Sequence, residues 1–423
     1  MKKNTLFTIL SLLVFSSSVA TAQTEFRVLN DMMTRFNDVN DSGLGLIVSG
    51  YYDFTTGTIT EFEPEALGVV SINNDGNVAG SIYYDEPNFI LQAAYRIDNT
   101  WKGIGFLPEQ DPQNDTFTTY AISSNSRYVT GQTHVGWDYG GFLFDTETET
   151  LTGVFDSEGE AAALYTVNSE GIAGGWVDRP ASFGTRRVPA YRTTDGEIHF
   201  IPEQLPQESG VNAISHINDA NIMVGDYDFL PFIYDLNTDT FTRYELPGGA
   251  PSGTFTQISE NGVAVGYADI DFEVRDAIVY HPSIGEQPVL LADLLNDRGI
   301  EINTHDGLLG TAIAISPNGE YIVGWVNGPP MFAEGWILYI DDLILGTENL
   351  SKEPITAYPN PVRNILNISS SNINNVAVYT IAGQKLMDVA STNQIDFSGM
   401  SNGVYLVKIF TEENVETIKV IKK

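Results

Sequence analysis

Four aromatic residues follow glycines that recur through the chain, and their types and spacing suit a binding role. The residue after the recurring glycine is aromatic at Tyr51, Trp176, Tyr267 and Trp325. Flat rings at equivalent positions around a ring of repeats would form a platform for sugar rings or peptide side chains. The alternative interpretation is that these rings pack between repeats, because large aromatic side chains commonly fill such spaces.

Carboxylates and histidines give less support to catalysis or metal binding. The five histidines are scattered and lack the spacing of metal ligands. Two motifs, Asp226-x-Asp228 and Asp269-x-Asp271, place paired carboxylates on one side of an extended strand, which suits calcium. Neither motif continues into a complete calcium loop, so we predict no cofactor and leave calcium open. No acid and base are singled out, because the separation of glycosidase carboxylates is set only by the folded chain.

Composition excludes several functional classes. The chain has no cysteine, so it has no disulfide framework, no thiolate metal site and no cysteine nucleophile. The net charge of −34 belongs to the part before Ser351, because the tail is slightly basic. A body this acidic repels phosphate backbones and anionic lipid, so we expect no nucleic-acid partner.

The N-terminus predicts export. Lys2 and Lys3 precede an apolar run from Leu6 to Val14, and Ala20-Thr21-Ala22 supplies small residues for cleavage. This pattern is typical of a secretory signal peptide, here residues 1–22. No later segment has the roughly 20 unbroken apolar residues that a spanning helix requires, so we expect no transmembrane segment.

Residues 23–345 contain seven copies of one pattern. In each copy an apolar residue precedes Asn or Ser, a polar turn follows, and small and apolar residues lead to a glycine. Each copy provides about four short strands, with Asn, Asp and Gly at the hairpin turns. The copies lie roughly 45 residues apart, a spacing typical of propeller blades. The closing glycines are Gly50, Gly80, Gly131, Gly175, Gly225, Gly266 and Gly324.

The body is therefore predicted to be all-β, a seven-bladed β-propeller, with six or eight blades as alternative counts. One short helix is expected, over Pro288–Asp297. The second half of the repeat, as in Ala93-Ala94-Tyr95-Arg96 and Pro189-Ala190-Tyr191-Arg192, resembles extracellular HAF-repeat proteins. That resemblance implies an extracellular location and assigns no catalytic residue.

The tail, residues 354–423, follows a predicted linker at 346–353 and alternates apolar and polar residues, which predicts a small β-sandwich. Its ordered motifs resemble the type A C-terminal sorting domain of the type IX secretion system of Bacteroidetes. The resemblance implies the type IX machinery as partner, transport across the outer membrane, and then release or attachment at the cell surface. The motif residues are Tyr358, Pro359, Asn360, Pro361, Gly383, Gly403, Tyr405 and Lys419.

These observations predict an exported protein of the cell surface or the medium that acts as a binding module for a polysaccharide or protein. The alternative is a secreted glycan hydrolase or lyase, with a carboxylate site at the mouth of the propeller channel. A purely structural surface protein is a third interpretation. Fold does not separate the three, because propellers serve all of them.

Overall fold

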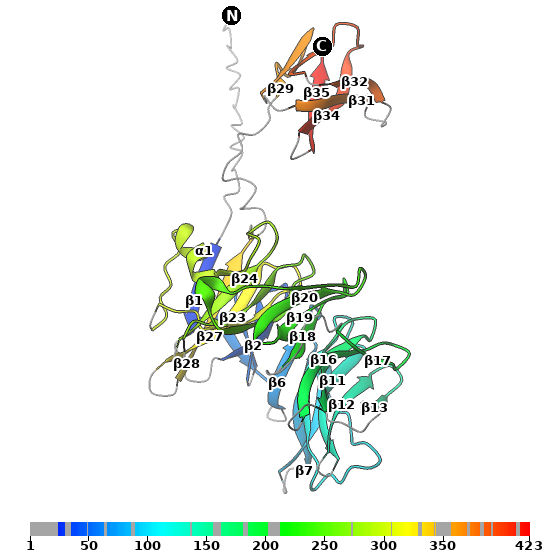
Figure 1. Ribbon diagram of the computed structural model, residues 1–423, viewed down its shortest axis with the longest axis vertical. Helices are drawn as coiled ribbons and strands as arrows, with labels where there is room; N and C mark the ends of the chain where they lie inside the picture. Colours follow the sequence, from blue (N-terminus) through cyan, green and yellow to red (C-terminus); the bar gives the residue numbers. More distant parts are fainter. Residues whose placement is uncertain are drawn as a thin grey trace, which may run out of the picture. The chain divides into compact units, whose positions relative to one another are not determined.

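The chain forms two compact units, Met1–Thr347 and Glu348–Lys423, in a computed structural model (Figure 1). The predicted signal peptide, the whole predicted linker and Gly383 lie outside the described residues. No helix among the described residues is long and apolar enough to cross a membrane. The described residues are 24–29, 35–48, 50–62, 66–85, 89–135, 138–154, 162–180, 185–201, 212–271, 274–305, 307–328, 332–341, 343, 357–369, 373–380, 385–390, 392–411 and 415–423.

The first unit is nearly all-β, and its described residues form seven four-stranded antiparallel sheets. Six sheets are meanders of consecutive strands. The first three are β2 (Phe36–Val39), β3 (Leu44–Ile47), β4 (Gly50–Asp53) and β5 (Thr58–Glu61); β6 (Ala66–Ile72), β7 (Val78–Asp85), β8 (Ile90–Ile97) and β9 (Thr100–Gly103); β10 (Phe117–Ile122), β11 (Tyr128–Val135), β12 (Asp138–Asp145) and β13 (Thr150–Val154). The next three are β14 (Ala162–Val167), β15 (Ala173–Pro180), β16 (Thr185–Arg192) and β17 (Ile198–Phe200); β18 (Ala213–Ile217), β19 (Ile222–Tyr227), β20 (Leu230–Asp235) and β21 (Thr240–Arg243); β22 (Ser252–Ile258), β23 (Ala264–Asp269), β24 (Arg275–Tyr280) and β25 (Val289–Leu290).

The seventh sheet joins the two ends of the unit. Strands β26 (Thr311–Ile315), β27 (Tyr321–Gly328) and β28 (Phe332–Ile340) are completed by β1 (Thr24–Leu29) as the outer strand. The register runs antiparallel, from Thr24 opposite Ile340 to Leu29 opposite Gly335. The first described residues of the chain therefore complete the last repeat.

Apolar side chains hold each sheet against the next. Leu46 of the first sheet packs with Val69 and Val78 of the second, and equivalent clusters lie between the later neighbours. In the last cluster, Phe36 of the first sheet packs with Ile337 of the seventh. Because a four-stranded sheet exposes two apolar faces, this packing covers both faces of every sheet, and the seven sheets close into a ring.

A hydrogen-bonded ring joins the turns between the first and second strands of each sheet. We call this end of the unit the turn face. In four turns the leading Asn donates a side-chain hydrogen bond to the next turn, as Asn40 Nδ2 does to Asn73 O at 3.1 Å. In the other three the leading residue is Ser, and the Asn two residues later makes the contact. Asn318 N closes the ring by donating to Asp41 Oδ1 at 2.8 Å. The leading residues are Asn40, Asn73, Ser123, Asn168, Asn218, Ser259 and Ser316.

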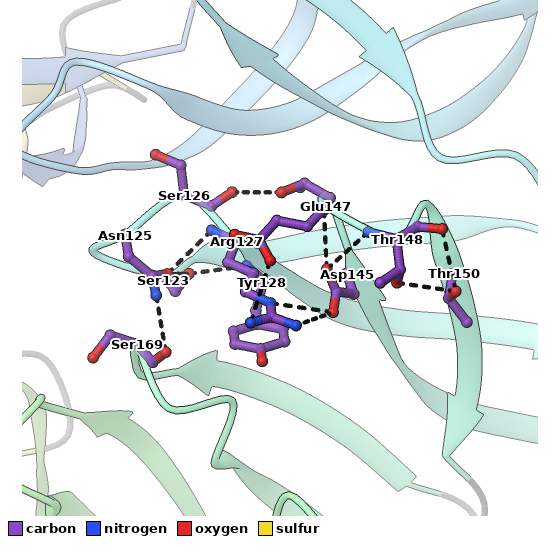
Figure 2. A network of polar contacts seen from close by, with 11 residues as sticks. Ser123, Asn125, Ser126, Arg127, Tyr128, Asp145, Glu147, Thr148, Thr150 and Ser169 are labelled. Carbon is purple, nitrogen blue, oxygen red and sulfur yellow. Dashed lines mark hydrogen bonds and ion pairs between the residues drawn. The ribbon is translucent and has the colours of Figure 1, made fainter.

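The third turn shows how the Ser version works (Figure 2). Ser123 Oγ lies 2.7 Å from Asn125 Oδ1, and Asn125 Nδ2 donates to Ser169 O in the next turn at 2.9 Å. Arg127 lies beside it, with Nη2 2.9 Å from Asp145 Oδ2.

Each first strand carries a β-bulge at the same place, which leaves one residue without a partner on the second strand. In six sheets, the residue just before the bulge pairs with the recurring glycine on the second strand. A Cβ at Gly225 would collide with the carbonyl oxygen of Ala213, and equivalent collisions occur in the other five sheets. These glycines therefore permit a close approach between two strands of one sheet.

The predicted helix is present and slightly shorter than expected. Helix α1 (Leu291–Asp297) follows β25 and buries Leu291 and Leu295 against Trp336 of the seventh sheet. A 3-10 turn, η2 (Pro247–Gly249), precedes β22.

The second unit contains two antiparallel sheets that share one apolar core. Leu366 and Phe397 on the side of the first sheet pack with Val378 and Val407 of the second. The three-stranded sheet is β29 (Ala357–Tyr358), β30 (Ile365–Ile368) and β33 (Gln394–Asp396); the four-stranded sheet has the order β32 (Lys385–Ala390), β31 (Ile373–Thr380), β34 (Gly403–Thr411) and β35 (Val415–Lys422).

Candidate binding cavity

A cavity of about 350 Å³ lies at the centre of the seven sheets, and the first strand of every sheet contributes to its wall. All seven bulge residues line it, because a residue without a partner in the sheet is displaced from the ladder. Five of the seven carry a polar group. The bulge residues are Asn37, Val70, Tyr120, Tyr165, Ser215, Thr256 and Ile313.

Asp38, His216 and Gln257 are the most polar side chains of the wall. The amide Nε2 of Gln257 lies 3.4 Å from Asp38 Oδ1 and 3.4 Å from His216 Nε2. Burial raises the pKa of Asp38 to about 6, and burial lowers the pKa of His216 to about 4. At pH 7 Asp38 is therefore mostly ionised and His216 is neutral, so the imidazole retains one nitrogen acceptor.

These polar groups also hold neighbouring sheets together. Asp38 Oδ2 accepts a hydrogen bond from Ile72 N of the next sheet at 2.9 Å, and Oδ1 accepts one from Val39 N at 2.9 Å. Gln257 Oε1 accepts from Ile315 N in the same way at 2.7 Å. Both carboxylate oxygens of Asp38 already accept backbone hydrogen bonds, which favours a structural role over acid–base catalysis.

The structure separates the four aromatic residues predicted to bind ligand. Trp176, Tyr267 and Trp325 occupy equivalent positions on the second strands β15, β23 and β27. Tyr51 lies instead on the third strand β4, and the equivalent position belongs to Val48, which is 42% exposed. The equivalence predicted for Tyr51 is therefore wrong, because the first sheet has Ile47 where the others have glycine.

Arginine side chains cover the three equivalent rings. Trp176 is 3% exposed, and its Nε1 donates to Tyr165 OH at 2.8 Å. The Arg187 guanidinium carbon lies 4.0 Å from the centre of the Trp176 ring. Arg275 lies 3.6 Å from the Tyr267 ring centre, and Arg35 lies 3.5 Å from that of Trp325. Each of these rings offers one face to an arginine, so the rings position guanidinium groups.

Arg187 lies on the side of the cavity away from the turn face, which we call the hairpin end. On β14, Ala163 pairs with Trp176 and lies two residues before the bulge residue Tyr165. The turn begins three residues after Tyr165, so Trp176 and the turn lie on opposite sides of the bulge. Burial raises the pKa of Tyr120 to about 12 and that of Asp226 to about 7. The positive charge of Arg187 acts on both groups in the opposite direction and more weakly.

The carboxylate pairs considered for calcium are divided among other contacts. Asp228 forms an ion pair with Arg243 at 3.3 Å, and Asp269 forms one with Arg275 at 2.8 Å. Asp271 Oδ1 accepts a hydrogen bond from Val274 N. Within the described ranges, no group of three or more His, Asp or Glu side chains is arranged to hold a metal ion.

Arg187 and the bulge residues were absent from the sequence predictions. One signal could have identified the arginine. Arg187 and Arg275 both stand two residues before the residue that pairs with the ring, Pro189 for Trp176 and Ala277 for Tyr267. The bulges leave no comparable mark, since the bulge residues share no chemical type.

In the second unit, the Tyr358-Pro359-Asn360-Pro361 motif attaches the start of the domain to its last strand. Asn360 Nδ2 donates to Lys419 O at 2.8 Å, and Asn360 Oδ1 accepts from Ile421 N at 2.9 Å. Both peptide bonds that precede the prolines are cis. Lys419 takes part through its backbone, and Tyr358 is exposed.

The later motif residues lie on β34. Gly403 begins this strand, opposite Lys422. Tyr405 is buried, packs edge-on against Phe397 with ring centres 5.8 Å apart, and donates its hydroxyl hydrogen bond to Ser401 O at 2.7 Å. Tyr405 therefore supports the domain core, whereas Gly403 is exposed.

Comparisons with solved structures found likenesses to the first unit. An oligogalacturonate lyase from Vibrio parahaemolyticus is 13% identical, with 75% of this chain and 97% of that chain covered and a TM-score of 0.49. An oligogalacturonate lyase in complex with manganese is 11% identical, with coverages of 77% and 100% and a TM-score of 0.49. The Dos1 propeller is 12% identical, with coverages of 71% and 76% and a TM-score of 0.38. Likenesses of this size carry no argument about function.

A search of curated proteins found no match. A family model does match the tail: residues 356–423 fit the secretion system C-terminal sorting domain. This match confirms the sorting domain that the tail motifs predicted and implies the type IX machinery as a partner. The second unit is therefore a secretion sorting domain, and it indicates export to the cell surface or secretion.

Proposed function

We propose that the first unit is a seven-bladed β-propeller that binds a polysaccharide in its central cavity. The second unit is, in this proposal, a small β-sandwich that engages the type IX machinery of a member of the Bacteroidetes. The cavity carries the proposal, because all seven inner strands place a bulge residue in one space and five of these seven residues carry a polar group.

The size and chemistry of the cavity suit a sugar. Its volume of about 350 Å³ lies within the range of about 300–1,000 Å³ that is typical of small-ligand sites. Ser215, Asn37 and neutral His216 supply donors and acceptors that match sugar hydroxyl groups. Tyr120 and Tyr165 add aromatic surface to the same wall.

Hydrogen bonds across the turn face favour entry of the ligand from the hairpin end of the cavity. Ser124 Oγ of the third turn donates to Asp219 Oδ2 of the fifth turn at 2.5 Å, so a hydrogen bond crosses between turns that are not neighbours. A polysaccharide chain end or side branch would therefore approach from the side on which Arg187 lies.

Glycan binding by the mature chain, residues 23–423, tests the proposal. We would measure binding to an array of marine and plant polysaccharides for the wild type and for Ser215→Tyr. The variant fills the cavity with a side chain that two other bulge positions already carry, so we expect it to fold and to lose binding at least tenfold. Thr60→Tyr, on the exposed outer strand β5, is the control and should bind as the wild type does.

Two outcomes would overturn the proposal. If the wild type binds no polysaccharide, the ligand class is wrong, and a protein partner becomes the better interpretation. If Ser215→Tyr folds and binds unchanged, the ligand does not occupy the cavity. Turnover of a bound glycan would favour the alternative of a hydrolase or lyase.

A further inference from the structure

We propose that the ligand is an anionic polysaccharide and that Arg187 binds its carboxylate or sulfate group at the hairpin end of the cavity. This inference rests on the proposed function and narrows its ligand class. It starts from one guanidinium group and the side chains that fix its position.

Aromatic contacts fix Arg187 beside the cavity wall. Its guanidinium lies on the buried ring of Trp176, and Trp176 is held by the hydrogen bond from its Nε1 to Tyr165 OH. Tyr165 lines the cavity, and its ring packs against that of Tyr120 with centres 4.8 Å apart. The chain of contacts from Arg187 through Trp176 to Tyr165 and Tyr120 leaves the arginine little freedom, which lowers the entropy cost of binding through it.

Arg187 differs in its side-chain hydrogen bonds from Arg275, Arg243 and Arg127. Arg275 and Arg243 also lie on this side of the unit, and each forms an ion pair with an aspartate. Arg127 at the turn face contacts both Asp145 and Glu147 (Figure 2). Among the described residues, none accepts a hydrogen bond from the Arg187 side chain. A half-buried guanidinium carries five N–H donors, so an acceptor from a ligand would satisfy donors that have no acceptor among those residues.

The planar donor set of arginine specifies the kind of ligand. Stacking on a ring leaves the edges of the guanidinium free, and those edges bind carboxylate or sulfate oxygens in pairs. The carboxyl whose charge acts on Arg187 is that of Asp226, and no hydrogen bond joins the two residues. In a chain of net charge −34, a fixed cation of this kind is what an anionic sugar would need to overcome long-range repulsion.

The test compares three polysaccharides and four proteins. The probes are polygalacturonate, which carries carboxylates, lambda-carrageenan, which carries sulfates, and neutral laminarin. Isothermal titration calorimetry at constant ionic strength would follow the mature wild type, Arg187→Gln, Arg187→Lys and Arg127→Gln. Arg127 is the matched control, because it also lies on an aromatic ring, that of Tyr128, but at the turn face.

We expect the wild type to bind polygalacturonate or lambda-carrageenan, and the preferred probe identifies carboxylate or sulfate as the group recognised. Arg187→Gln should weaken that binding at least tenfold, and Arg187→Lys should restore part of it, because lysine keeps the charge without the paired donors. Arg127→Gln should bind as the wild type does. Equal thermal midpoints would show that Arg187→Gln is folded.

The outcomes separate this inference from the proposed function. Binding of laminarin alone, or anionic binding that folded Arg187→Gln retains, would overturn the inference and leave a polysaccharide-binding propeller. If none of the three probes binds and the wider array is also silent, the inference and the proposed function both fall.

Discussion

The turn face and the hairpin end of the cavity are built by the same seven repeats, and they use their polar groups in different ways. At the turn face, donors and acceptors pair within the protein, from Asn40 around to Asn318 and Asp41. At the hairpin end, no described residue accepts a hydrogen bond from the Arg187 side chain, and Asp226 is a half-buried carboxyl whose pKa burial raises to about 7.

The difference shows that one end of a ring of similar repeats can stabilise the fold while the other end is available to bind a ligand. A polar ring whose bonds are all made internally fixes the spacing of the sheets and leaves little for a ligand to bind. Groups left unsatisfied or held in an unfavourable ionisation state reduce stability, and they concentrate where ligands bind. We therefore expect changes at the turn face to alter folding and changes at the hairpin end to alter binding or pH response.

The largest expected effect is at the turn face. Asn73 is 4% exposed; its Oδ1 accepts from Asp75 N and Asn77 N, and its Nδ2 donates to Ser126 Oγ of the next turn. Asn73→Ala leaves these buried groups without partners, so we expect a loss of about 3 kcal/mol in the free energy of unfolding, measured by urea denaturation.

The three Ser-type turns provide a rescue for this variant. The double variant Asn73→Ser with Asp75→Asn copies the pattern of Ser259 and Asn261 in the sixth turn. It should recover more than half of the lost stability. If the double variant is no more stable than Asn73→Ala, the two turn types are not interchangeable and the ring is not the source of the effect.

Asp226 should give an intermediate effect that depends on pH. Its folded pKa of about 7 lies above the ordinary aspartate pKa of 3.8, so the folded protein binds an extra proton between these values. Its contribution to stability is therefore present at low pH and is lost as the pH rises toward 7. Asp226→Asn removes the buried charge and should raise stability at pH 8 by about 2 kcal/mol, with no gain at pH 4.

Thermal melting across this pH range measures the effect. Asp98→Asn, in an exposed turn, is the control and should show no difference at either pH. A gain for Asp226→Asn that is the same at pH 4 and pH 8 would mean that the carboxyl of Asp226 does not titrate in this window.

The smallest expected effect distinguishes the two arginines by stability. Arg127→Gln removes ion pairs to Asp145 and Glu147 at the surface, so we expect a slight loss of stability that high salt abolishes. Arg187→Gln removes no ion pair and should show no such salt dependence. Urea midpoints at low and high salt would measure both; a larger, salt-dependent loss for Arg187→Gln would contradict the contrast between the two ends.

Several features of the fold were predictable because they depend on local chemistry. Turn residues such as Asn73 and Gly76 fix tight turns through side-chain hydrogen bonds and a positive φ angle, so each repeat is recognisable from a few residues. The short helix was also predicted, with its start displaced by three residues. In the first repeat, the sequence prediction matched Gly50 with the recurring glycines of the other repeats. The equivalent position in this sheet is Ile47, and Gly50 begins the third strand instead.

The cavity could not be predicted from such local signals. A bulge residue faces the centre through the register of two strands, and Asn37, Ser215 and Ile313 have no sequence pattern in common. The role of Trp176 depended on the same information. A tryptophan side chain can serve either as a platform for a sugar or as a buried support for an arginine. The solvent exposure of the ring decides between these two roles, and exposure depends on the tertiary structure.

By itself, the sequence determined the recurring turns and the sorting domain that indicates export, because each is encoded by residues close together in the chain. Tertiary structure decided that β1 completes the last sheet, that seven bulges meet at one cavity, and that the Arg187 side chain stands beside it with no acceptor among the described residues. Those facts join residues from distant repeats, and their contacts arise only when the ring closes and each sheet packs on the next.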